Sequence, residues 1–560
     1  MERQVKSSCG ICFSLFEQAF EQAKAYSTVL LLGLPLCAQP PQAPLILRST
    51  TRLVQLNVIV QDKKGNPVTD LKKEDFEVKD AGKVQTVSLF SMESNAPLPT
   101  AAEPLPPNVF TNKLERRAGT PSSVSVILLD WLNTKFADRA YAQAQVIKFL
   151  QQQIKPEDHI GLYTLSRGLR VLHDYTSDST ELLARLNSSD GKSLPDLSRA
   201  ESRSGGDAML LDTWLRGGGA SRAEADFYTI NRVNGTLKAI EFIANHLAAI
   251  PGRKNLIWVS GGFPLEIGLD NPAAMRDPTR EQRTFSDEID RTVRAVNNAN
   301  LAIYPVDARG LMTSPQFSAE RRGNANRRPP RIPPPAPGSK NQDTMRELAS
   351  RTGGRAYINT NDLNKAIRDA IQDTRVTYTL GFYPSGEKFD GKFHELKVKV
   401  DRPGANIRYR KGYFDFAEQP QDEKTRKTEL ADAVWSPMEA SALGLVVQVQ
   451  PDASKPKSMN VFVRVDPHGI SLQQQGERWD GRLDLLFVQK DDRGGQFNGV
   501  TDTMELQLQQ ANYEKISKEG LIYKKTIEMA PQANQLRVVV RDAASGTVGT
   551  VTIPFREIKK

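Results

Sequence analysis

The residues best suited to chemistry lie where an apolar stretch ends. Residues 124–129 are almost all aliphatic and run without alternation into Asp130, and Thr134 follows four residues later. A carboxylate and a hydroxyl on one turn supply the oxygen ligands that a hard cation such as Mg2+ prefers. Asp130 has a second interpretation that needs no ligand, because an aspartate at a strand end can cap a turn or the next helix by accepting backbone N–H groups. The sequence leaves both interpretations open.

Other reactive residue types lack the partners that their chemistry needs. The five histidines form no His-Glu-x-x-His motif and no pair four residues apart, which argues against a zinc hydrolase. Ser166, in the segment TLSRG, follows an expected strand and partly matches the nucleophile elbow of hydrolases, but the first glycine of that motif is missing. Ser166 with a histidine as base is therefore kept as the enzymatic alternative.

An α/β region must position Asp130. The run at 124–129 is apolar on both faces, which predicts a central strand of a parallel sheet covered by helices on each side. Asp130 then lies at the carboxyl edge, where open α/β sheets bind their ligands. A helix over 136–153 and buried strands over 159–166, 255–260 and 301–307 follow. We therefore predict an α/β fold with a doubly wound, mostly parallel sheet.

The order strand, Asp-x-x-x-Thr, helix and the segments after it resemble a von Willebrand factor type A (VWFA) domain. The resemblance is narrower to the VWFA-related domains of bacterial, acidobacterial-type secreted proteins. It covers residues 121–374 through the segments VSVILLDWLNTKFADRAYAQAQVIKFL, PGRKNLIWVSGGFP, LAIYPVDARG and LASRTGGRAYINTNDL. The resemblance implies a Rossmann-like fold with a metal-ion-dependent adhesion site. Such a site binds Mg2+ or Mn2+ and leaves a position for an acidic oxygen of a protein partner.

The resemblance also implies that this adhesion site is degenerate. Asp130 matches the first aspartate of the family's Asp-x-Ser-x-Ser turn and Thr134 matches its second serine, whereas Leu132 replaces the first serine. The threonine of the second loop corresponds to Thr236 or Thr229. The aspartate of the third loop is replaced by Gly261.

These matches assign Asp130, Thr134 and Thr236 as candidate metal ligands. With a single carboxylate, we expect any binding of Mg2+ or Mn2+ to be weak.

Composition predicts a folded chain that does not bind nucleic acid. The chain has 560 residues, 25% charged and 39% hydrophobic, with a formal net charge of +9. This positive excess is modest for the length, and no basic helix or aromatic–basic platform accompanies it.

The amino terminus predicts export. Residues 27–36 form an apolar core that is too short to span a bilayer and ends near Cys37-Ala38-Gln39. Cleavage after Ala38 would remove the three cysteines (Cys9, Cys12 and Cys37) and leave no membrane span in the mature chain. Lipidation at Cys37 is the alternative. We expect a periplasmic or extracellular protein of the cell envelope.

Segments rich in β-strands flank the α/β region. The strands expected within 53–90 cannot bury a core of their own, so we expect them to pair with strands at 378–413 in an immunoglobulin-like sandwich. The predicted domains are a signal peptide (1–38), an N-terminal immunoglobulin-like segment (39–95), a linker (96–120), a VWFA-like domain (121–375) with inserts at 187–228 and 311–342, strands that complete the immunoglobulin-like module (376–416), a linker (417–442) and a C-terminal β-sandwich (443–560).

These features favour an exported, non-enzymatic binding or adhesion-type module with an unidentified protein partner, acting through the degenerate metal site. Two alternatives remain open: an envelope hydrolase that uses Ser166, and a structural scaffold without a ligand.

Overall fold

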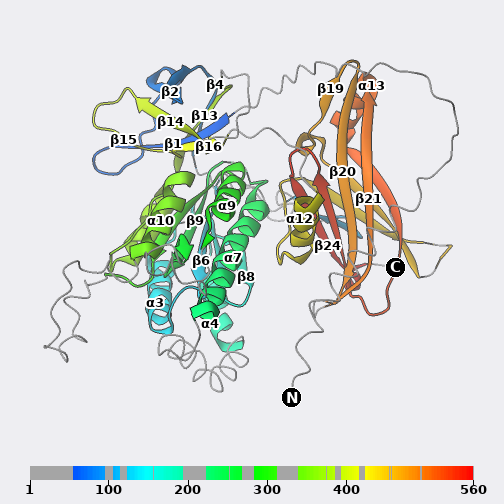
Figure 1. The fold of residues 1–560 in the computed structure, drawn as a ribbon, viewed down its shortest axis with the longest axis horizontal. Helices are drawn as coiled ribbons and strands as arrows, with labels where there is room; N and C mark the ends of the chain where they lie inside the picture. The colour runs from blue at the N-terminus through cyan, green and yellow to red at the C-terminus, as the bar shows by residue number, and fades with distance from the viewer. Residues whose placement is uncertain are drawn as a thin grey trace. The chain divides into compact units, whose positions relative to one another are not determined.

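The computed structural model describes residues 54–94, 105–113, 123–155, 157–192, 222–250, 252–267, 283–311, 339–373, 375–384, 393–414, 423–452, 454–455, 457–491 and 495–558. The predicted signal peptide with its three cysteines, and most of both predicted inserts, lie outside these residues. The described residues fall into two compact units, which Figure 1 draws in one ribbon. One unit holds 54–94 and 123–414, and the other holds 105–113 and 423–558.

A five-stranded mixed sheet forms the centre of the first unit, in the order β12-β9-β6-β7-β8. Four strands are parallel and β8 is antiparallel at one edge. All six residues of β6 are buried, as the aliphatic run predicts for a central strand. Pro305 lies in β12 at the other edge, where its missing N–H is tolerated. The bounds are β6 Ser125–Asp130, β7 Ile160–Leu165, β8 Leu169–Thr176, β9 Lys254–Ser260 and β12 Leu301–Asp307.

Helices cover both faces of this sheet (Figure 1). One face packs into a core with α3, α4 and α11, to which Ile127 and Leu129 of β6 contribute. The alternate residues Val126 and Leu128 are equally buried on the opposite face, where α9 and α10 contact β12 and α7 packs against α9. The bounds are α3 Phe136–Gln152, α4 Ser179–Lys192, α7 Arg222–Leu247, α9 Ser286–Asn298, α10 Ser339–Thr352 and α11 Leu363–Gln372; a short hairpin joins β10 Glu266–Ile267 to β11 Arg283–Thr284.

Strands from both sides of the α/β region form one β-sandwich. Its sheets have the orders β15-β1-β13-β4 and β16-β14-β2-β3. β1 pairs with β13 in the register Leu56↔Leu380, and β2 pairs with β14 in the register Val78↔Val398, so neither half closes its sheets alone. The bounds are β1 Val54–Gln61, β2 Phe76–Asp80, β3 Lys83–Gln85, β4 Val87–Ser94, β13 Val376–Phe382, β14 Phe393–Val400, β15 Asn406–Arg408 and β16 Gly412–Phe414.

The second unit is a larger antiparallel sandwich with an apolar core between its sheets, and a smaller apolar cluster lies under α12. Its sheets have the orders β22-β18-β17-β5 and β19-β20-β23-β24, with β21 also paired to β20. The bounds are β5 Val109–Thr111, β17 Leu445–Pro451, β18 Ser458–Val465, β19 Gln473–Gln475, β20 Arg478–Lys490, β21 Gln496–Gln509, β22 Leu521–Glu528, β23 Gln535–Asp542, β24 Val548–Pro554, α12 Glu423–Trp435 and α13 Gln510–Glu519. No helix in the described part of either unit is long and apolar enough to cross a membrane.

Several predicted boundaries need correction. The segment 96–120 is not linker throughout, because β5 pairs with β17 and Asn112 binds backbone groups of the same sandwich. β5 has only three residues and follows several prolines, so its sequence is too short to show the alternation that predicts a strand. The segment 417–442 contains α12, whose Leu430 and Val434 pack against the sandwich. At the predicted insert 187–228, α4 and α7 extend inward from both ends.

Candidate functional site

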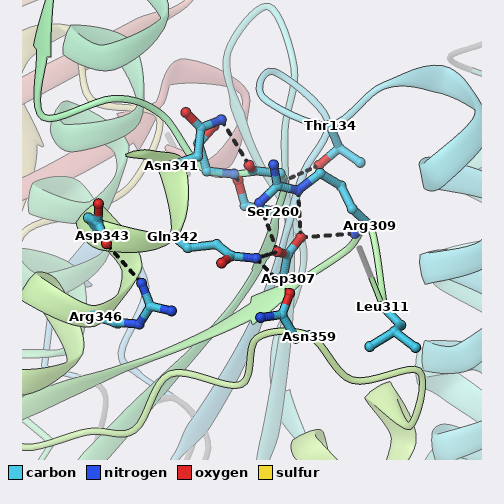
Figure 2. A network of polar contacts seen from close by, with 12 residues as sticks. Thr134, Ser260, Asp307, Arg309, Leu311, Asn341, Gln342, Asp343, Arg346 and Asn359 are labelled. Carbon is cyan, nitrogen blue, oxygen red and sulfur yellow. Dashed lines mark hydrogen bonds and ion pairs between the residues drawn. The ribbon is translucent and has the colours of Figure 1, made fainter. Parts of the chain in front are cut away.

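The candidate site lies at the carboxyl edge of the five-stranded sheet. Asp130, Ser260 and Asp307 are the last residues of the neighbouring strands β6, β9 and β12, and all three are fully buried. Figure 2 shows Ser260 and Asp307 beside Thr134 and the start of α10. Side chains that are far apart in sequence therefore meet at the edge where such sheets place ligands.

The Asp130 carboxylate accepts four hydrogen bonds. Oδ1 accepts from the Asn133 backbone N at 3.1 Å, and Oδ2 accepts from Asn133 Nδ2 at 2.8 Å. Oδ2 also accepts from Trp258 Nε1 at 2.9 Å and from Ser260 Oγ at 2.7 Å. Burial raises the pKa of Asp130 above its ordinary value, and the bonds from Asn133, Ser260 and Trp258 oppose that rise. All of these donors are neutral.

Both predicted threonine ligands lie in the same network. Thr134 Oγ1 donates to the Asp130 carbonyl at 2.6 Å and accepts from Gly261 N at 3.1 Å. Thr236 Oγ1 donates to the Arg232 carbonyl at 2.8 Å and accepts from Asn133 Nδ2 at 2.6 Å. Thr236 rather than Thr229 is therefore the threonine that α7 brings to Asp130.

Asn133 joins two of the predicted residues, Asp130 and Thr236. Its amide nitrogen lies between Asp130 Oδ2 and Thr236 Oγ1, bonded to both. A carboxylate can only accept, and the Thr236 hydroxyl already donates to a backbone carbonyl, so both oxygens need a donor at this point. The two N–H groups of the Asn133 side chain donate to these oxygens, at the position where the resemblance to VWFA domains would place a cation.

The residues present do not fit a Mg2+ or Mn2+ ion in this arrangement. Mg2+ requires near-octahedral oxygen ligands at about 2.0–2.1 Å, whereas the Asp130 oxygens and both threonine hydroxyls already have protein partners. Within the described ranges, no group of three or more histidine, cysteine, aspartate or glutamate residues could hold a metal. A Cβ on Gly261 would lie 2.5 Å from the Asn133 carbonyl oxygen, so the turn has no room for the family's third-loop aspartate.

A second polar network closes the edge beside β12. Asp307 Oδ1 accepts from Arg309 N at 3.0 Å and from Arg309 Nε at 2.8 Å, and Oδ2 accepts from Arg309 Nη2 at 2.8 Å. Gln342 Nε2 reaches Asp307 Oδ2 at 3.1 Å and Asn359 Oδ1 at 3.0 Å. Asn341 Nδ2 binds the carbonyls of Gly261 and Gly262 (Figure 2). The first turn of α10 thereby fixes the loops after β9 and β12.

The geometry around Ser166 does not support the hydrolase alternative. A general base must lie within hydrogen-bond reach of its nucleophile. His173 lies opposite Leu162 in the β7–β8 pair, roughly 13 Å along the strand from Ser166. His173 Nε2 lies 3.0 Å from Glu181 Oε1 instead. His159 precedes the opposite end of β7.

Comparisons with known proteins identify no family for this chain. No family model matches it, and no curated protein sequence is similar to it. Solved structures show weak likeness, and three of them illustrate it. An aerotolerance-related membrane protein from Bacteroides fragilis is 14% identical to this chain, with a TM-score of 0.22. The match covers 44% of this chain and 98% of the Bacteroides fragilis protein. The conserved hypothetical protein BatB from Bacteroides thetaiotaomicron is 14% identical, with a TM-score of 0.23, and the match covers 45% of this chain and 98% of BatB. A type V pili tip protein from Porphyromonas gingivalis is 9% identical, with a TM-score of 0.25, and the match covers 84% of this chain and 77% of the pili tip protein. Identities and TM-scores this low say nothing about what this chain binds.

The residues that sequence reasoning missed are mainly amides and backbone groups. Asn341 and Gln342 carry the second network, and neither belongs to a motif of fixed spacing. The position of Asn133 in the Asp130 turn suggests a carbonyl ligand for a cation, whereas the structure uses its side-chain amide as a hydrogen-bond donor. Trp258 was predicted as a buried strand residue, but its indole N–H is also a donor to Asp130. A buried indole nitrogen needs an acceptor, and this is the one signal that could have linked β9 to Asp130 from the sequence.

Proposed function

We propose that this chain is an exported, non-enzymatic protein-binding module of the VWFA type, which presents the carboxyl edge of its α/β region to a protein partner. The sheet order β12-β9-β6-β7-β8, with one antiparallel edge strand, supports the VWFA-type assignment that the sequence segments suggest. The flanking sandwich supports the immunoglobulin-like assignment. The Asp130 network would hold the edge in one shape with an amide in place of a cation.

The observation that carries this proposal is the position of exposed apolar side chains. Among the described residues of the α/β region, the exposed large apolar side chains are Phe136 (76%), Phe227 (60%), Tyr228 (43%) and Leu311 (58%). Phe136 begins the helix after β6, and Leu311 follows the end of β12, so both lie at the carboxyl edge.

Phe227 and Tyr228 belong to the same end of the sheet. Thr236 of α7 contacts Asn133 at the carboxyl edge, and the helix then continues toward the start of β9 at the amino edge. Phe227 precedes Thr236 by nine residues, or about 13 Å of helix, so it extends outward beyond the carboxyl edge. Exposed aromatic residues on a rigid frame are typical of protein-binding surfaces.

The test compares two double variants of the full chain. Phe136→Ser/Phe227→Ser removes two side chains at the carboxyl edge, and Val84→Ser/Leu89→Ser removes two exposed side chains from the sandwich as a matched control. Each immobilised variant is incubated with envelope proteins of the organism that produces the chain, and bound proteins are quantified by mass spectrometry. Burial of one such side chain contributes about 2 kcal/mol, so the first variant should bind the partner at least about a hundredfold more weakly. If both variants capture the same amount of the partner, the carboxyl edge is not the binding surface and the α/β region is a scaffold.

Export is proposed from the amino-terminal segment alone. A mature chain that begins at Gln39 when the protein is isolated from cells supports cleavage after Ala38. A lipid-modified Cys37 would instead support the anchored alternative.

A further inference from the structure

A polar cavity lies at the amino edge of the α/β sheet, on the opposite side from the carboxyl edge, where β1 of the first sandwich meets this region. The cavity has about 270 Å³ of empty space including its mouth. Gln55, Asn57 and Arg410 line it from the sandwich, and Arg253, Asn297 and Thr352 line it from the α/β region. None of the described residues that line it is acidic.

Arg253 is the buried cation of this cavity. It is 4% exposed, and its Nη2 donates to Tyr304 Oη at 3.1 Å and to the Gly353 carbonyl at 2.6 Å. Its Nε is buried and has no hydrogen-bond partner. A buried guanidinium N–H without an acceptor is costly, so the position calls for an acceptor inside the cavity.

The nearest carboxylate does not meet this need. The hydrogen bonds between Asp373 and Arg253 run through Tyr304, whose hydroxyl donates to Asp373 Oδ2 at 2.9 Å. Asp373 Oδ1 is bound by Arg408 and by Gln61 Nε2 at 3.1 Å. Arg408 is therefore the direct ion-pair partner of Asp373, and the hydrogen bonds of Asp373 leave Arg253 Nε without an acceptor.

Arg410 brings a second guanidinium to the same space. It lies between β15 and β16, and its Nη2 donates to the Gln55 carbonyl at 2.6 Å. Its backbone approaches the α/β region so closely that a Cβ on Gly353 would lie 2.7 Å from Arg410 N. Two arginines from two structural layers therefore line one cavity, together with the amide side chains of Gln55, Asn57 and Asn297.

We infer that this cavity binds a small oxyanion between Arg253 and Arg410. Guanidinium groups match the oxygen spacing of phosphate, sulfate and carboxylate groups, and the neighbouring amides supply further donors. The 270 Å³ includes open solvent at the mouth, so the enclosed space is far smaller than the roughly 300–1,000 Å³ pockets of drug-sized ligands and favours an ion of a few heavy atoms over a nucleotide. The bound anion would join the sandwich to the α/β region, because its ligands come from both.

The test measures thermal unfolding and calorimetric binding of the full chain. Sodium phosphate, sulfate and acetate are compared with sodium chloride at equal ionic strength. Phosphate or sulfate should raise the unfolding midpoint of the first unit, since an anion that binds only the folded state stabilises it. A response to acetate alone would assign the site to a carboxylate group, and identical midpoints in all four salts would overturn the inference.

Two arginine variants distinguish anion binding in the cavity from a general effect of salt on the charged surface. Arg410→Gln changes a half-buried side chain at the cavity and should lower phosphate affinity by about tenfold or more, because it removes one charge-assisted contact. Arg402→Gln removes an exposed arginine of the same sandwich, which pairs with Asp70, and should leave phosphate affinity unchanged. An equal loss in both variants, or in neither, would refute the assignment to Arg410.

Discussion

Asn133→Ala tests whether an amide takes the place of a cation beside Asp130. The substitution removes the donor to Asp130 Oδ2 at 2.8 Å and the donor to Thr236 Oγ1 at 2.6 Å. A hydrogen bond to a charged group contributes about 1.5–3 kcal/mol and a neutral one about 1 kcal/mol, so the expected loss of unfolding free energy is about 3 kcal/mol. For a unit of this size the unfolding midpoint should fall by roughly 5–10 °C.

The assay is thermal unfolding with EDTA and then with millimolar Mg2+ or Mn2+. Wild type should show the same midpoint in all three conditions, because the Asp130 and threonine oxygens already have protein partners. Asn231→Ala, an exposed change on α7, serves as the control and should shift the unfolding free energy by less than about 0.5 kcal/mol.

A cation-dependent rise in wild type that disappears in Asp130→Ala would refute this reasoning. Such a result would mean that Asn133 moves aside and that the adhesion site binds metal.

Three further predictions concern Lys254, Gly261 and Asn112. Burial lowers the pKa of Lys254 from 10.5 to about 7. Between about pH 7 and pH 10.5 the unfolded chain therefore binds more protons than the folded chain, so the free energy of unfolding should rise with pH across this window, by at most about 1.4 kcal/mol per pH unit. Lys254→Met should remove that slope in chemical denaturation at several pH values, and an unchanged slope would contradict it. Gly261→Ala should destabilise the first unit by about 1–3 kcal/mol, because its Cβ would meet the Asn133 carbonyl at 2.5 Å; a neutral effect in denaturant would show that the turn relaxes freely. Asn112→Ala should lower the stability of the second unit by about 2–4 kcal/mol, since the buried amide binds the backbone of Ala440, Leu443 and Leu445. Hydrogen exchange should show the loss in β17, and protection that stays at the wild-type level would argue against a structural role of β5.

Local pattern was sufficient where burial alone decides the structure. The run before Asp130 is apolar at nearly every position, and only a strand covered on both faces can bury such a run. The same reasoning predicted the helix over 136–153, which the structure shows as α3 at Phe136–Gln152, because its apolar face repeats with the helical period. The strands at 53–90 are too few to bury a core, and the structure pairs them with strands after the α/β region.

Tertiary structure decided what occupies the space beside Asp130. Sequence reasoning selected Asp130, Thr134 and Thr236, and these residues do lie in one network. The role of Asn133 depends on where a turn directs its amide and on a threonine 103 residues away, and no local spacing encodes that contact. The cavity of Arg253 and Arg410 likewise exists only because two layers meet there. Hydrophobic burial is a property of each segment and can be seen in its composition. The pairing of buried polar groups depends on directions and distances between segments, which only the folded chain determines.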